Sequence, residues 1–234
     1  MRSQCQTTPP PSPAPSRALK RQVWSALLGG CLLAGSCPAL AAPSPTPTTA
    51  PDSGQPDTQP LTAMETVYNG GATGWVVVRN LSNTQPGLVA SCRMVSGAQG
   101  HMLAFVTLRN EDNVKGDLGE HAPPVLYQIV VGDAAWNLKP GGTVGMVFWE
   151  DDKAMNTHLV AADRDLLLNP SMPKADYVKV LNGLPGTQNF TFSLAAASTG
   201  APIASGLAVP TKGIAPAVAA YKSCVAQAGL GDLD

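Results

Sequence analysis

Short apolar runs, separated by clusters of turn-forming residues, dominate the first half of the regularly patterned part of the chain. The runs are rich in valine, isoleucine and aromatic residues, and Gly, Pro, Asn or Asp residues lie between them. This pattern predicts β-strands. The predicted strands cover residues 73–79, 88–95, 102–108, 125–131, 143–149 and 155–161. Turn residues recur between them at the spacing of an antiparallel sandwich or barrel.

A helical pattern replaces the strand pattern at residues 171–183. Ser171 is expected to cap the start of this helix, Pro173 fits its first turn, and Gly183 fits the position just after its end. Apolar residues recur at helical spacing, which predicts one buried face formed by Tyr177, Val180 and Leu181.

Two further strands and a last helix complete the pattern. The strands are predicted over residues 189–194 and 203–209, and the helix starts near Gly213. One face of this helix carries Val218, Tyr221, Cys224 and Val225. Cys224 is therefore expected to point inward. The predicted fold class is mainly β, an antiparallel β-sandwich with two short helices late in the chain.

The N-terminal part has the order of a secretory signal. A basic segment at 16–22 precedes a short apolar run at 23–33, and Ala39 and Ala41 form a small-residue cleavage pattern. We expect residues 1–41 to be a signal peptide that is cleaved after Ala41. A single-pass anchor is the alternative, but the apolar run is short and rich in glycine for a membrane span.

Two other features of this region affect the domain organisation. Cys31 and Cys37 each follow a sequence that loosely resembles a lipobox, so a lipoprotein is an alternative product of processing. Residues 42–66 are mostly Pro, Thr, Ser, Ala, Asp and Gln, and such a segment buries too little surface to offset its ordering entropy. We expect a disordered linker at 42–66 and a β-sandwich domain at 67–230.

Cleavage of the leader changes the cysteine count. Cys5, Cys31 and Cys37 leave with it, and the mature chain retains Cys92 and Cys224. Two cysteines in an oxidising compartment predict a disulfide, which ties the last helix to an early strand. Two buried free thiols are the alternative. No CxxC motif is present, so a thiol-exchange enzyme is not expected.

Cleavage also changes the charge. The leader contains four basic residues and no acidic one, so its removal takes the formal net charge from −1 to −5. An acidic protein is poorly suited to bind nucleic acid or an anionic membrane. No later apolar run approaches the length of a membrane span, and we expect no span after cleavage.

The end of the chain resembles a known family. A strand with a cysteine comes early in the domain, and the close reads P-x-K-G-I-x-x-A-x-x-x-Y-x-x-C, with Pro210, Lys212, Gly213, Ile214, Ala217, Tyr221 and Cys224 at the named positions. This order resembles the invasion-associated locus B family of exported bacterial β-sandwich proteins. The resemblance implies export and an association with host-cell invasion, but no particular chemistry.

Metal ligands do not form a recognisable pattern. His101, His121 and His158 have no short ligand spacing among them, and we expect no metal site from them. The acidic loop at 111–121 offers Glu111, Asp112, Asp117 and Glu120 as oxygen ligands for calcium. Its order does not match an EF-hand, so a solvated loop is the preferred interpretation.

Catalytic motifs are not recognisable either. The sequence has no G-x-S-x-G elbow, Walker loop or dinucleotide-binding loop, so we predict no catalytic residue and no cofactor. The acidic cluster at 150–153 follows a strand and is expected to form a hairpin turn. Paired carboxylates for carbohydrate chemistry would need a cleft that fixes their separation.

The tryptophans suggest a surface for a partner. Trp75, Trp136 and Trp149 are candidates to line a binding surface for a sugar or peptide, although core packing is the usual role of such residues. We therefore expect a non-enzymatic envelope protein, periplasmic or secreted, that binds a protein or a glycan. The alternative is a periplasmic enzyme of carbohydrate or cell-wall chemistry that uses the acids near Glu150.

Overall fold

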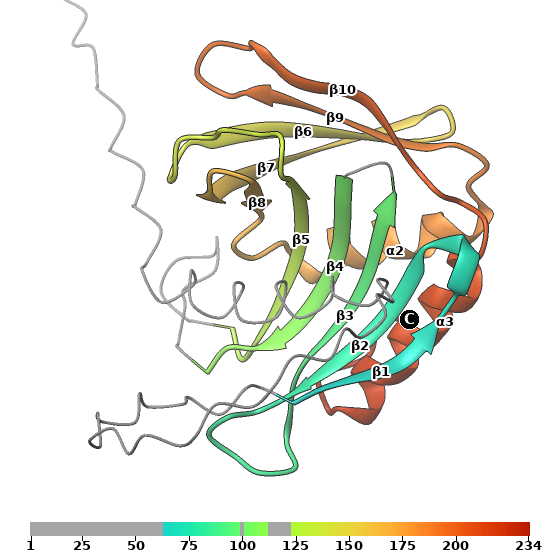
Figure 1. Ribbon diagram of the computed structural model, residues 1–234. Helices are drawn as coiled ribbons and strands as arrows, with labels where there is room; N and C mark the ends of the chain where they lie inside the picture. Colours follow the sequence, from blue (N-terminus) through green and yellow to red (C-terminus); the bar gives the residue numbers. More distant parts are fainter. Residues whose placement is uncertain (1–62, 99–100, 112–122) are drawn as a thin grey trace, which may run out of the picture.

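The computed structural model describes residues 63–98, 101–111 and 123–234 (Figure 1). Several predictions fall outside these residues. They are the signal peptide at 1–41, the linker up to residue 62, the candidate lipidation sites Cys31 and Cys37, and His121, Asp112, Asp117 and Glu120 of the acidic loop.

Ten strands form one sheet in which every neighbouring pair is antiparallel, so the mainly β prediction is confirmed. The strand order is β1-β2-β3-β4-β5-β8-β7-β6-β9-β10. The strands are β1 (Met64–Asn69), β2 (Trp75–Leu81), β3 (Val89–Ala98), β4 (His101–Arg109), β5 (Val125–Asp133), β6 (Thr143–Glu150), β7 (Lys153–Asp163), β8 (Leu166–Leu168), β9 (Phe190–Ala196) and β10 (Pro202–Val209). Because the ladder is continuous, a sandwich of two separate sheets is not confirmed.

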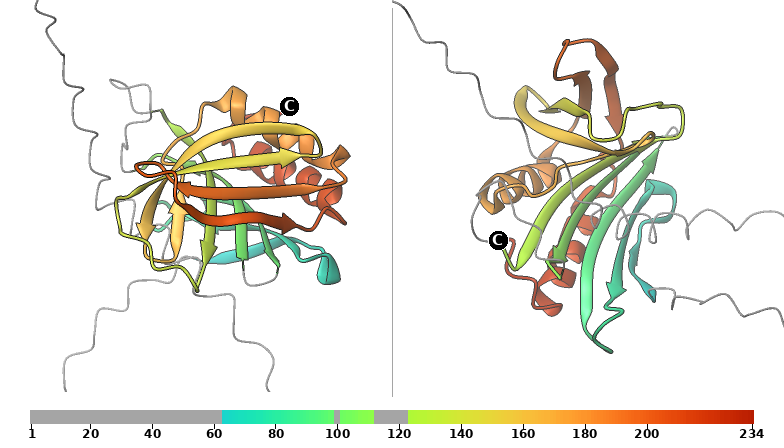
Figure 2. Two further views of the ribbon diagram at one scale, coloured as in Figure 1. Left: turned by 90° about the horizontal axis from the view of Figure 1, so that it is seen from above. Right: turned by 90° about the vertical axis from the view of Figure 1, so that its left-hand side faces the viewer.

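The sheet bends so that its two halves enclose a common core. Figures 1 and 2 show β6–β10 crossing over one end of β1–β5. Side chains from both halves belong to one buried cluster, with Phe105 and Ile129 from one half and Phe148 and Phe192 from the other. These residues alternate with outward-facing ones along each strand, as the period of two requires.

Two helices late in the chain pack on this core, as predicted. Helix α2 (Lys174–Gly183) buries Tyr177, Val180 and Leu181 and is followed by the 3-10 turn η2 (Leu184–Gly186). Its capping was predicted wrongly. Pro173, not Ser171, occupies the cap position, and no side chain caps the helix. Gly183 is the last helical residue, with a right-handed backbone, and does not follow the helix.

Helix α3 (Ile214–Gln227) lies against β1, β2 and β3 at the end of the chain (Figure 1). Gly213 precedes it with φ 78°, a left-handed conformation that favours glycine. The predicted inward face is confirmed, since Val218, Tyr221, Cys224 and Val225 are all buried. Cys224 is bonded to Cys92 of β3, with Cα atoms 6.1 Å apart, so the predicted disulfide is confirmed.

Two strands were missed by the sequence analysis. Strand β1 begins at Met64, inside the range expected to be linker, and most of its side chains are exposed. Among the described residues it pairs with β2 alone, at the edge of the sheet, and because both of its faces are largely exposed its sequence has no alternating apolar pattern. Strand β8 has only three residues, all leucine and all buried. The short 3-10 turn η1 (Gly71–Thr73) connects β1 to β2.

Candidate functional site

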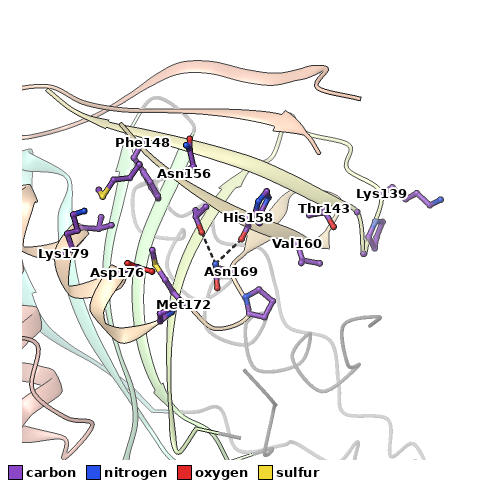
Figure 3. A pocket seen from close by; sticks show the side chains of 18 residues that line it. Lys139, Thr143, Phe148, Asn156, His158, Val160, Asn169, Met172, Asp176 and Lys179 are labelled. Carbon is purple, nitrogen blue, oxygen red and sulfur yellow. Dashed lines mark hydrogen bonds between the residues drawn. The ribbon is translucent and has the colours of Figure 1, made fainter. Parts of the chain in front are cut away.

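A pocket of about 930 Å³ lies between β7 and α2 (Figure 3). The loop from β5 to β6, the strand β6, and the segment from β8 to α2 complete its wall. We call it the β7–α2 pocket. Its volume falls in the range of typical small-molecule and peptide sites.

The floor of the β7–α2 pocket is apolar. Phe148 of β6, Met172 before α2 and Val180 of α2 line it, and all three are buried members of the main core cluster. Phe148 points to the core because it alternates with the outward-facing residues of β6. Val180 belongs to the buried face of α2. The floor is therefore held by the core itself.

One wall of the pocket follows the edge of β7. Met155, Asn156, Thr157 and His158 all line the pocket, although consecutive side chains of a strand point to opposite faces. A cavity that contacts four consecutive residues must run along the edge of the strand. Within the described residues, this part of β7 pairs with β6 alone, because pairing with β8 starts at Val160.

Asn169 presents a free acceptor in this region. Its Nδ2 atom donates to Thr157 Oγ1 and to the His158 carbonyl oxygen, both at 3.1 Å (Figure 3). Its Oδ1 atom is buried and accepts no hydrogen bond from any described residue. Asn169 lines the pocket and is only 6% exposed. A buried carbonyl oxygen without a donor carries an energetic cost, which a ligand donor would remove.

Charged residues lie at the two ends of the pocket. Lys139 precedes β6 at one end, and Lys179 of α2 lies at the other (Figure 3). Asp176 of α2 is the single carboxylate among the lining residues. The pocket therefore combines an apolar floor, neutral hydrogen-bonding groups, a basic end at Lys139 and an end where Lys179 lies with Asp176.

Glu150 lies outside this lining, at the end of β6. It is 7% exposed, and its Oε1 atom has no hydrogen-bond partner among the described residues. Burial raises the pKa of this carboxyl group to about 7. Lys153 and Lys179 oppose the rise in pKa, and Asp151 adds to it. The carboxyl group packs against Gly183, where a Cβ atom would lie 2.8 Å from Glu150 Cδ.

The other acids of the 150–153 cluster form the predicted hairpin turn. Asp151 has φ 55°, and its Oδ1 atom accepts hydrogen bonds from the backbone N–H groups of Gln188 and Asn189 at 3.0 and 2.8 Å. Its own N–H donates to the Asn189 carbonyl oxygen at 2.9 Å. These contacts attach the turn to the segment before β9, which is a structural role.

The predicted tryptophan surface needs correction. Trp75 is completely buried, and its Nε1 atom donates to the Pro210 carbonyl oxygen at 2.8 Å, so it cannot contact a partner. Trp136 lies in the loop after β5 and is partly buried against the core, and Trp149 is partly exposed on the outward face of β6. None of the three lines the β7–α2 pocket.

The histidines do not converge in the described part of the chain. His101 Nδ1 lies 2.6 Å from Asp133 Oδ2, between β4 and β5. His158 is exposed in the pocket wall. No group of three His, Cys, Asp or Glu side chains suited to a metal ion occurs among the described residues. Glu111 accepts a hydrogen bond from Ser82 Oγ at 3.1 Å.

Sequence reasoning missed the main residues of the pocket. Asn156, Asn169 and Lys179 carried no motif, because their proximity depends on how β8 and α2 fold back onto β7. The polar run Asn156-Thr157-His158 in an otherwise apolar strand was the available signal. Among the described residues, no helix is long and apolar enough to cross a membrane.

A scan against protein-family models, a search of curated proteins and a search of solved structures each return no match to this chain.

Proposed function

We propose that this protein is an exported, non-enzymatic binding module of the bacterial envelope, and that its β7–α2 pocket is the binding site. The observation that carries the proposal is the pocket itself. It has an apolar floor held by the core, and beside it lies Asn169, whose buried Oδ1 atom has no donor among the described residues. Protein or glycan partners both present N–H or O–H donors for such a site.

The proposed cellular location rests on other features of the chain. The Cys92–Cys224 disulfide is typical of proteins in oxidising compartments, and the signal-like residues 1–41 predict export. We propose a periplasmic or secreted protein, with lipidation at Cys31 or Cys37 as the alternative. The resemblance of the segment from Pro210 to Cys224 to the invasion-associated locus B family supports a role at the host interface.

The location can be tested by the intact mass of the protein from its native envelope. A mass that begins at Ala42, with no alkylated thiol before reduction, is expected for the soluble exported form. A mass that begins at Cys31 or Cys37 with added acyl chains would establish the lipoprotein instead. Retention of residues 1–41 together with two free thiols would contradict export.

The binding site can be tested with a variant that fills the pocket. Asn156→Trp places a large side chain in the pocket wall, and Gln227→Trp places the same residue on the exposed end of α3 as a control. The disulfide-bonded domain is screened on a glycan array and against a library of random peptides. A ligand is expected whose affinity falls at least tenfold with Asn156→Trp and stays unchanged with Gln227→Trp. Ligands that bind both variants equally would contradict the assignment.

An enzyme of carbohydrate or cell-wall chemistry has less support. Asp176 is the single carboxylate among the lining residues, whereas such enzymes use a carboxylate pair across the substrate. Glu150 has a pKa near 7, which suits a general acid or base, but it lies outside the pocket lining.

A further inference from the structure

The open edge of β7 is an unusual feature in the interior of a sheet. Residues Lys153–Asp163 form β7, which pairs with β6 from Lys153 to Val160. On its other side, β8 pairs only from Val160 onward. In the described structure, the stretch from Lys153 to Leu159 therefore has one unpaired edge, and the β7–α2 pocket lies along it. Unpaired edges attract other strands.

The hairpin geometry determines which backbone groups face this edge. Glu150 pairs with Lys153 across a two-residue turn, so this pair exchanges hydrogen bonds. In antiparallel strands such pairs alternate with pairs that do not exchange hydrogen bonds. The N–H and C=O groups of Ala154, Asn156 and His158 therefore point away from β6, towards the open edge.

A side chain already uses one of these groups. The His158 carbonyl oxygen accepts a hydrogen bond from Asn169 Nδ2, which confirms the direction derived from the hairpin. The backbone groups of Ala154 and Asn156 have no such contact in the described structure. The open stretch from Ala154 to His158 is about 13 Å long, at 3.3–3.4 Å per residue.

The chain leaves a vacant strand position next to this edge. Leu168 of β8 pairs with Val160 of β7, and an antiparallel continuation would place the next residues beside His158 and Asn156. Instead, the backbone N–H groups of Asn169 and Met172 donate to carbonyl oxygens of β5, at 3.0 and 2.7 Å, so this segment follows β5 and leaves the edge of β7 unpaired. The pocket lies between this segment and the edge of β7.

We propose that the β7–α2 pocket binds an extended peptide segment of a partner protein, which adds to the open edge of β7 as a strand. The proposal rests on the proposed function and names its ligand class. Alternate side chains of the peptide face the floor formed by Phe148, Met172 and Val180, and therefore are apolar. Lys139 at one end favours an acidic residue that flanks the segment on that side, whereas Lys179 shares the other end with Asp176.

The test begins with selection of random twelve-residue peptides, displayed on phage, on the disulfide-bonded protein. Asn156→Pro removes one N–H group from the open edge, whereas Asn156→Ala removes the same side chain and keeps that N–H group. Selected peptides are expected to lose at least tenfold in affinity with Asn156→Pro and less than threefold with Asn156→Ala. Equal affinity for the two variants would overturn strand addition.

A second measurement uses the wild-type protein, in case Asn156→Pro alters the fold. Each residue of a selected peptide is N-methylated in turn. Strand addition predicts that binding is lost at every second position, because only alternate N–H groups face β7. Losses without this period would overturn the proposal.

The outcomes separate this proposal from the proposed function. A saccharide that binds the wild type but not Asn156→Trp, with no peptide behaving likewise, would overturn peptide binding and leave the binding module intact. If no saccharide or peptide is affected by Asn156→Trp, both proposals are wrong.

Discussion

The hydroxyl oxygens of Tyr177 and Tyr221 lie 2.7 Å apart in the core, and Tyr221 makes a second contact of 2.7 Å with Thr107 Oγ1. All three residues are fully buried. They come from α2, α3 and β4, so this chain of hydroxyl groups joins both helices to the sheet. Burial raises the pKa of both tyrosines, which remain neutral donors and acceptors over the whole physiological range.

Removing the central hydroxyl is expected to cost more than removing the terminal one. Tyr221→Phe leaves the hydroxyls of Thr107 and Tyr177 without their shared partner, and we expect a loss of about 2–3 kcal/mol in the free energy of unfolding. Tyr177→Phe breaks one contact and is expected to cost about 1 kcal/mol. Urea denaturation measures both values. Equal losses would contradict the central position of the Tyr221 hydroxyl in this chain.

The disulfide is expected to contribute strongly to stability. Cys92 and Cys224 are 132 residues apart in the sequence, and closing so long a loop restricts the unfolded chain. Replacing both cysteines with alanine should lower the free energy of unfolding by about 4–5 kcal/mol, on the chain-entropy account. Denaturation with and without reductant provides the measurement. In the double variant, reductant should have no further effect.

The raised pKa of Glu150 predicts that the free energy of unfolding falls as pH rises. Its folded-state pKa of about 7 exceeds the ordinary value of 4.5. As pH rises, the unfolded chain therefore loses this proton at a lower pH than the folded protein does. Between these values the folded state binds more protons, and stability falls as pH rises, reaching a constant level above pH 7. Glu150→Gln should remove this slope and be more stable than wild type at pH 8, by roughly 1–3 kcal/mol.

The measurement is the difference in unfolding free energy between wild type and Glu150→Gln at several pH values. Taking the difference cancels the titration of the other carboxylates. A difference that does not change between pH 4.5 and pH 7 would contradict the raised pKa.

Gly183→Ala is expected to be destabilising, although alanine usually stabilises a helix by about 0.5–1 kcal/mol relative to glycine. The added methyl group would lie 2.8 Å from Glu150 Cδ, too close for an ordinary contact. In a Glu150→Ala background that obstacle is absent, and the same substitution should become neutral or stabilising. Thermal unfolding of the four proteins of this cycle measures the coupling. No coupling would mean that Gly183 is required for another reason.

The elements that sequence predicted well are those with a strong local pattern. The runs containing Trp75, Ile129 and Phe148 became strands because β-branched and apolar residues alternate or continue along them. The inward position of Cys224 followed from helical spacing. Strand β1 carried no such signal, because an exposed edge strand is held mainly by backbone pairing.

The candidate site was not predictable in the same way. Phe148, Asn156, Asn169 and Lys179 come from four segments, and only the tertiary fold brings them around one pocket. Trp75 was a candidate for a binding surface, with core packing as the alternative, and its indole reaches Pro210 and fills the core. Sequence gives the residue type of a tryptophan but not the direction of its side chain across the sheet.

Helix α3 also has a consequence for how the protein is made. It is the last regular element of the chain, yet its buried face and the following Leu230 and Leu233 belong to the main core. A polypeptide that emerges N-terminus first therefore lacks part of its core until residues 214–233 have emerged. Cys92 must also wait for Cys224 before the two can be joined. The core of this domain therefore closes only after a segment that follows every described strand has emerged.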